Sequence, residues 1–224
     1  SVVATGSTHT MLSSGEGFVV TQSLQDGTFV NTWTLSAPGV SVVNNPGNVT
    51  MSGNITLAGN FAVVASGDID LTGASINLSG ATAGSLTIFA GYDSSLVTNG
   101  TQTVTTQTIN NLTPSAGGGS VIGGADIDVR GTGSGGVAGS VTVVARGGSI
   151  DVGDIQAGGD VNNGRVMLIG ETGVTVGDIN TTSNSGSGGA VTIAVGQAEL
   201  QSVSITNGAL SGTVAPNSTS AGDI

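Results

Sequence analysis

The chain has 224 residues, of which 40 are Gly, 8% are charged and none is Cys. Its formal net charge of −11, from 14 acidic and 3 basic residues, argues against nucleic acid or an anionic membrane surface as a partner, because both need cationic side chains. The absence of Cys rules out disulfides and thiolate metal sites, and no apolar run reaches the ~20 residues of a membrane-spanning helix.

The first 45 residues lack the sequence period of the rest of the chain. They hold Trp33, Phe18 and Phe29, three of its six aromatic residues (one Trp, one Tyr and four Phe). A stack of β-coils needs a covering at its end, because a bare coil presents apolar side chains and unpaired strand edges. We therefore predict an irregular N-terminal coil or cap over residues 1–45.

Short segments with alternating apolar residues follow, which is typical of strands with one buried face. They are Asn48-Val-Thr-Met, Asn54-Ile-Thr-Leu, Phe61-Ala-Val-Val, Gly67-Asp-Ile-Asp-Leu, Ser75-Ile-Asn-Leu and Gly84-Ser-Leu-Thr-Ile-Phe. Residues 92–120 fit this cycle poorly. Within them we predict a strand from Thr101 to Ile109 and a loop from Pro114 to Gly119. Ala125-Asp-Ile-Asp-Val then matches the segment that starts at Ser149, one coil later.

The repeat is most regular from residue 139 onward. Gly139-Ser-Val-Thr-Val-Val, Gly164-Arg-Val-Met-Leu-Ile and Gly189-Ala-Val-Thr-Ile-Ala align without gaps at a spacing of 25 residues. Ser149-Ile-Asp-Val and Gly173-Val-Thr-Val are 24 residues apart, as are Asp154-Ile and Asp178-Ile. Each coil thus consists of three short strands with Gly-rich turns between them.

A unit this short cannot bury a core alone, but it can form one turn of a solenoid. We predict an all-β chain in which residues 46–224 form a right-handed parallel β-helix with coils of about 24–25 residues. Roughly nine coils at ~4.8 Å each would give a rod about 45 Å long. An antiparallel sandwich is the main alternative, but it does not explain a 25-residue period.

The run Gly139-Ser-Val-Thr-Val-Val-Ala-Arg-Gly-Gly-Ser-Ile-Asp-Val-Gly-Asp-Ile resembles the filamentous haemagglutinin-like exoproteins of two-partner secretion. The resemblance covers about residues 46–210. It implies a bacterial protein at the cell surface or outside the cell that serves in adhesion or surface display, and it implies no catalytic residues.

Paired carboxylates are the candidate metal ligands. Asp68 and Asp70, like Asp126 and Asp128, flank an inward-facing Ile and therefore share the outward face of a strand. Asp151, one coil beyond Asp128, would extend them into a ladder of oxygen ligands for Ca²⁺. A solvated acidic face is the alternative reading, and no other cofactor is expected.

The same carboxylates could be the acid and base of a polysaccharide-cleaving β-helix. A lyase also needs cationic groups to neutralise a uronate, and a hydrolase usually needs aromatic platforms. With no Lys and few aromatic residues, the sequence lacks a constellation of nucleophile, base and orienting group. We therefore predict that the protein is not an enzyme, and a degrading enzyme is a distant alternative.

The tripeptide Gly-Asp-Ile begins a segment at Gly67, Gly153 and Gly177, and it recurs at Gly222. We expect coils of one copy to continue into another, because open solenoid ends allow head-to-tail polymers. The expected function is an extracellular, non-catalytic subunit of a surface filament or matrix fibre, with other copies of itself as partners. The alternative is a cell-surface adhesin that binds glycans or proteins.

Overall fold

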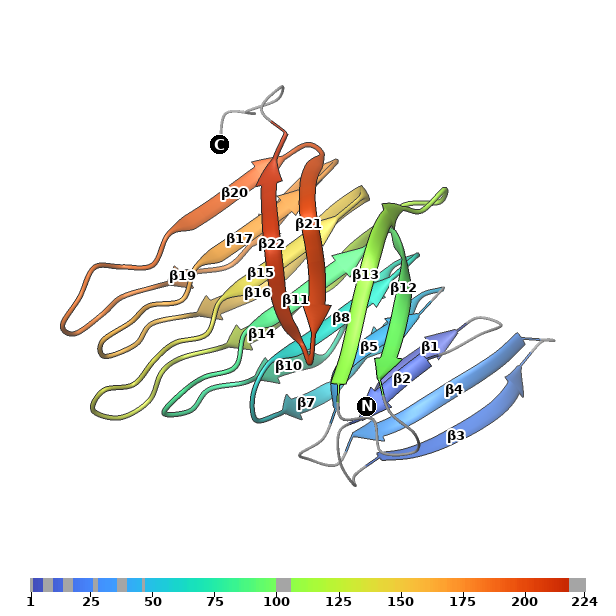
Figure 1. Ribbon diagram of the computed structural model, residues 1–224, viewed down its shortest axis with the longest axis horizontal. Coiled ribbons are helices and arrows are strands. Elements are labelled where there is room, and N and C mark those ends of the chain that lie inside the picture. Colours follow the sequence, from blue (N-terminus) through green and yellow to red (C-terminus); the bar gives the residue numbers. More distant parts are fainter. Residues whose placement is uncertain are drawn as a thin grey trace.

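A computed structural model describes the backbone of residues 2–5, 10–13, 18–25, 28–35, 40–45, 47–99 and 106–217. Side chains are described for residues 47–93, 109 and 111–217. These parts are all-β and form a β-solenoid of about five turns (Figure 1). The predicted fold class is confirmed, but the expected nine coils are too many. No helix in the described ranges is long and apolar enough to cross a membrane.

The strands of the coils form two sheets, here called A and B. Sheet B contains one strand from each coil. Its order is β2 (Thr10–Ser13), β5 (Val40–Asn45), β8 (Phe61–Ala65), β11 (Leu86–Ala90), β15 (Val141–Ala145), β17 (Val166–Gly170) and β20 (Val191–Val195). All neighbours from β5 onward are parallel, while β2 is antiparallel to β5. Val141, Val166 and Val191 lie in one row, so the 25-residue spacing does correspond to one turn.

Sheet A carries the second and third strand positions of the coils. Its parallel part comprises β6 (Val49–Met51), β7 (Gly53–Thr56), β9 (Ile69–Asp70), β10 (Ala74–Asn77), β14 (Gly119–Asp128), β16 (Gly147–Gln156), β18 (Gly173–Val176) and β19 (Ile179–Asn180). Ser149 pairs with Gly173 and Ile155 pairs with Ile179, as the 24-residue spacing predicts. Strands β14 and β16 each run through both positions, although the pairing between them is irregular.

One predicted stacking is wrong. The segment that begins at Ala125 does not lie over Ser149, because Ile127 pairs with Ile155, at the third strand position. The second position in that coil is occupied by Val121, which pairs with Ile150. Asp-Ile-Asp occurs at both strand positions of different coils, so sequence similarity alone does not distinguish them. Gly123 and Gly124, with φ of 115° and 64°, form the irregularity that separates the two positions in β14.

The solenoid core is built from the inward-facing residues of both sheets. Val141 and Val143 alternate with outward-facing residues along β15, and Ile127 and Ile155 do so in sheet A. These aliphatic side chains stack on the equivalent residues of the next coil and are almost fully buried. The alternating pattern in the sequence therefore marks the core, as expected for strands with one buried face.

Two hairpins leave the coil path and form a separate four-stranded antiparallel sheet, here called sheet C. The hairpins are β12 (Tyr92–Asn99) with β13 (Thr106–Pro114), and β21 (Ala198–Thr206) with β22 (Ala209–Pro216). Figure 1 shows these four strands side by side against the stacked coils. Residues 46–224 are thus not solenoid throughout, and this is why the coils number fewer than nine. The insertion spans residues 92–114, whereas Ser115 to Gly118 only turn the chain back into the coil.

Sheet C covers the outward face of sheet B. Phe89 and Val144 of sheet B, with Ile109 and Ile205 of sheet C, belong to one buried cluster. Phe89 and Tyr92 meet edge to face with ring centroids 5.5 Å apart. Strands β8, β11 and β17 are therefore buried on both faces, and apart from Thr87 in β11 their sequences have no polar side chain.

The N-terminal strands continue sheet A as an antiparallel extension. Strand β1 (Val2–Thr5) is antiparallel to β6 and to β4 (Thr28–Leu35), and β3 (Phe18–Gln25) is antiparallel to β4. Sheet A therefore ends on β3 at one side and on β18 at the other. The predicted strand residues 101–105 and the terminal tripeptide at Gly222 lie outside the described residues.

Candidate functional site

Two of the predicted carboxylate ligands, Asp68 and Asp126, belong to polar ladders at the starts of strands. Asn48 Oδ1 accepts a hydrogen bond from Asp68 N at 2.8 Å, and Asp68 Oδ1 accepts one from Ser120 N at 2.8 Å. Ser120 Oγ in turn accepts one from Ser149 N at 3.2 Å. Each side-chain oxygen thus binds the backbone of the next coil, and the ladder joins four coils.

A second ladder starts at the third strand position. Asp126 Oδ1 accepts from Asp154 N, and Asp154 Oδ1 accepts from Asp178 N, both at 2.9 Å. Glycine precedes both donors because the carboxylate of the coil below occupies the place of a Cβ at Gly153 and Gly177. This packing explains the recurring Gly-Asp-Ile tripeptide.

A third ladder stands at the start of sheet B. Ser85 N donates to Asn60 Oδ1 at 2.8 Å, Ser140 N donates to Ser85 Oγ at 3.0 Å, and Arg165 N donates to Ser140 Oγ at 3.2 Å. Glycine again precedes each donor. A Cβ at Gly139 would overlap the Gly84 carbonyl, so the coils pack backbone to backbone here.

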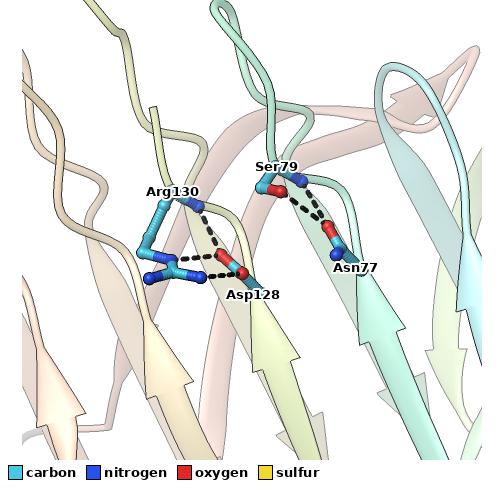
Figure 2. Close-up of polar contacts among 4 residues, drawn as sticks. All are labelled: Asn77, Ser79, Asp128 and Arg130. Atoms are coloured by element: carbon cyan, nitrogen blue, oxygen red, sulfur yellow. Dashed lines mark hydrogen bonds and ion pairs between the residues drawn. The ribbon is translucent and has the colours of Figure 1, made fainter. Parts of the chain in front are cut away.

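Other outward-facing polar side chains close the turns that follow strands. Asp128 Oδ1 accepts from Arg130 N at 3.0 Å, while Arg130 Nε and Nη2 hold both carboxylate oxygens at 2.9 and 2.6 Å (Figure 2). Asn77 closes the equivalent turn one coil below through Ser79 N and Oγ (Figure 2). Burial alone would raise the pKa of Asp128, but the bonds and charge of Arg130 lower it below its ordinary value. Asp70 likewise accepts from Thr72 N at 2.9 Å.

The five predicted metal ligands do not stand in one ladder. Asp128 lies beside Asn77 and Gln156 in neighbouring coils, whereas Asp151 lies beside Thr175 at the other strand position. Asp68 and Asp70 are also at that second position. Within the described ranges, no group of three or more His, Cys, Asp or Glu side chains is arranged to hold a metal ion. The partners that sequence reasoning missed for Asp126 are Asp154 and Asp178, and their signal was the 24-residue repeat of Gly-Asp-Ile.

A further charged group lies in the turns that follow β15, β17 and β20, beside the junction of sheets B and C. Glu171 forms an ion pair with Arg146, and it accepts hydrogen bonds from Gly147 N at 2.7 Å and Gln197 Nε2 at 3.1 Å. Burial would raise the pKa of Glu171, but these hydrogen bonds and the positive charge lower it. Burial raises the pKa of the nearby Tyr92 to about 12, opposed by the charge of Arg146.

The last coil is the most exposed part of the described core. Strands β18, β19 and β20 each pair on one side only, with β16 or β17, among the described residues. Val191 is 46% exposed, whereas Val166, which precedes it in the same row, is 0% exposed. Val195 is 40% exposed at the other end of β20. We call this surface, formed by residues 173–180 and 191–195, the open coil.

The open coil also ends the second polar ladder. Asp178 donates its backbone N–H to Asp154, but its own carboxylate makes no hydrogen bond to another described residue. In the two coils below, the equivalent carboxylate accepts a backbone N–H from the coil above. The open coil thus offers apolar side chains, strand edges and a ladder acceptor to a further layer of β-structure. Comparison of the chain with protein-family models, curated proteins and solved structures finds no significant match.

Proposed function

We propose that the protein is a non-catalytic, extracellular structural subunit that assembles end to end through its open coil. The observation that carries this proposal is the change along one row of sheet B, from a fully buried Val166 to a Val191 that is nearly half exposed. Val191 occupies a position that is buried in the preceding coil. Its exposure therefore indicates that a further strand can stack on β20 and cover it.

Association at this surface has a physical driving force. Full burial of an aliphatic side chain contributes about 1.5–3 kcal/mol, so covering the half-exposed Val191 and Val195 contributes roughly 1 kcal/mol each. New parallel or antiparallel pairing would also satisfy the edges of β18 and β20 that pair with no other described strand. Asp178 could accept a backbone N–H of the added layer, as Asp154 does one coil below.

The two ends of the solenoid differ, and this favours a head-to-tail arrangement. Sheets A and B end on β18 and β20 at the open coil, and on β3 and β2 at the other end. A second copy that places β3 on β18, or β2 on β20, would continue one of these sheets across the contact. Such a heterologous contact does not close on itself and produces an open fibre.

The use of the carboxylates supports a structural role. Asp68, Asp126 and Asp154 accept backbone N–H groups, and Asp128 is bound by Arg130. The oxygens of Asp68, Asp126 and Asp154 strengthen the stacking of coils, while Asp128 closes a turn within its own coil. The location outside the cell and the kinship with haemagglutinin-like exoproteins rest on the sequence resemblance, with which a β-solenoid is compatible.

The test compares polymer formation by the wild type with that of Val191→Asp, using sedimentation velocity and negative-stain electron microscopy. Val161→Asp is the matched control, since Val161 is also 46% exposed but lies in a loop of the preceding coil. We expect fibres from the wild type and from the control, and monomers from Val191→Asp. Monomeric wild-type protein at millimolar concentration would overturn the proposal. Equal assembly by both variants would do the same.

A further inference from the structure

A polar hollow lies at one edge of the solenoid, where three successive coils send out loops. Its volume is about 470 Å³, within the ~300–1,000 Å³ range of ligand sites. The side chains that line it include Arg130, Gln156, Asp160, Asn180, Thr182 and Asn184. The loops that follow β14, β16 and β19 lie side by side at this edge (Figure 1).

The walls of the hollow are held by hydrogen bonds between neighbouring loops. Asp160 Oδ2 accepts from Gly135 N in the loop below at 2.6 Å, and Asp160 O accepts from Ser183 Oγ in the loop above at 3.1 Å. Isolated β-bridges join Val137 to Asn162 and Gly159 to Ser183. The hollow is thus pre-formed, which lowers the entropy cost of binding.

Several polar groups in the hollow have unused hydrogen-bonding capacity toward other described residues. Arg130 is 52% exposed at its side chain and uses Nε and Nη2 for Asp128, which leaves Nη1. Asn180 uses Oδ1 to accept from Thr182 N and Oγ1, which leaves its amide N–H groups. The amide of Gln156 makes no hydrogen bond to another described side chain or backbone group and can both donate and accept.

We propose that this hollow binds an uncharged saccharide unit. Sugar hydroxyls both donate and accept hydrogen bonds, which matches a surface where amides, a guanidinium and a carboxylate alternate. An anionic sugar is disfavoured because the charge of Arg130 is already paired with Asp128, Asp160 lies in the wall, and the chain carries a net charge of −11. No aromatic ring lines the hollow, so hydrogen bonds supply the recognition.

The test is saturation-transfer NMR of the full chain with uncharged and sialylated trisaccharides of hexoses and N-acetylhexosamines. The binding variant is the double substitution of Gln156→Ala with Asn184→Ala, neither of which removes a hydrogen bond between described residues. Gln201→Ala is the matched control, because Gln201 is an exposed amide on β21, outside the hollow. We expect an uncharged trisaccharide to bind the wild type and the control, with about tenfold weaker binding to the double variant.

Three results would overturn the proposal: no transfer to any uncharged trisaccharide at millimolar concentration, equal binding by the double variant, or binding of sialylated trisaccharides alone. Loss of binding in the Gln201→Ala control would also contradict the assigned position. The outcome is independent of fibre formation, since Val191→Asp keeps the hollow intact and can be used as a monomeric background.

Discussion

Gly139 begins one of the 25-residue repeats, and its replacement by alanine tests how closely the coils pack. Gly139 is buried at the start of β15, beside Gly84 of the coil below and Gly164 of the coil above. An added Cβ would overlap the Gly84 carbonyl and lie 3.0 Å from Ser85 N. Both obstacles are backbone atoms, which cannot rotate away as a side chain would.

The expected cost combines two effects. Overpacking a buried site costs about 1–3 kcal/mol. The coils must also separate, which strains the hydrogen bonds from Ser140 N to Ser85 Oγ at 3.0 Å and from Leu86 N to Ser140 O at 2.8 Å, each worth about 1 kcal/mol. Alanine also reduces the conformational freedom of the unfolded chain, which offsets about 0.4–1 kcal/mol of this cost. The net destabilisation is therefore about 3 kcal/mol, which lowers Tm by roughly 6–12 °C in a domain of this size.

Urea and thermal unfolding followed by far-ultraviolet circular dichroism measure this change. Gly117→Ala is the control, since a Cβ there has no atom within 4 Å and its φ is not positive, so its stability should match or slightly exceed that of the wild type. If Gly139→Ala does not fold, Gly189→Ala serves instead, with a smaller loss because the last coil can move. Surface substitutions ordinarily change stability by up to about 0.5 kcal/mol. If Gly139→Ala changes the free energy of unfolding by no more than that, the close backbone packing at this glycine is contradicted.

Three more predictions concern the junction of sheets B and C. Tyr92→Phe should stabilise the protein by about 1 kcal/mol in urea unfolding, because the buried Tyr92 hydroxyl makes no hydrogen bond with a described residue; a loss of stability would indicate a partner. Ile205→Ala should cost about 2–4 kcal/mol, since Ile205 is fully buried between the sheets, and an unchanged urea midpoint would mean that sheet C is not docked. The folded pKa of Glu171 lies below its ordinary 4.5, so its contribution should be complete above pH 4.5 and fall as the pH drops through the folded value. Glu171→Gln should reduce the loss of stability below pH 4.5. A stability–pH curve equal to that of the wild type would show that Glu171 does not cause this loss.

The polar ladders show what the spacing of a sequence repeat predicts and what it leaves open. The Gly-Asp-Ile spacing revealed that Gly153 and Gly177 occupy equivalent places in the coil, but it did not show why glycine is needed. The reason is the carboxylate of the preceding coil, which fills the Cβ position and binds the next N–H. The same geometry places Asp68 and Asp126 in different ladders and Asp70 and Asp128 in turns, whereas the sequence suggested a single ladder.

The sequence by itself determined the all-β class, the 24–25-residue coil and the inward-facing aliphatic rows, because these depend on local alternation and a fixed period. The poor fit of residues 92–120 to the cycle is visible in the sequence, but only the tertiary structure decided that β12 and β13 form an antiparallel hairpin, since a hairpin and a solenoid strand have the same alternation. The pairing of that hairpin with β21 and β22 joins residues about 100 positions apart, for instance Ile109 with Ile205, and local pattern cannot encode such a contact. The strand position of Ala125 was likewise decided by the tertiary structure. The irregular backbone at Gly123 and Gly124 moves the segment from Ala125 to the third strand position, although its residue pattern is the same as at the second position.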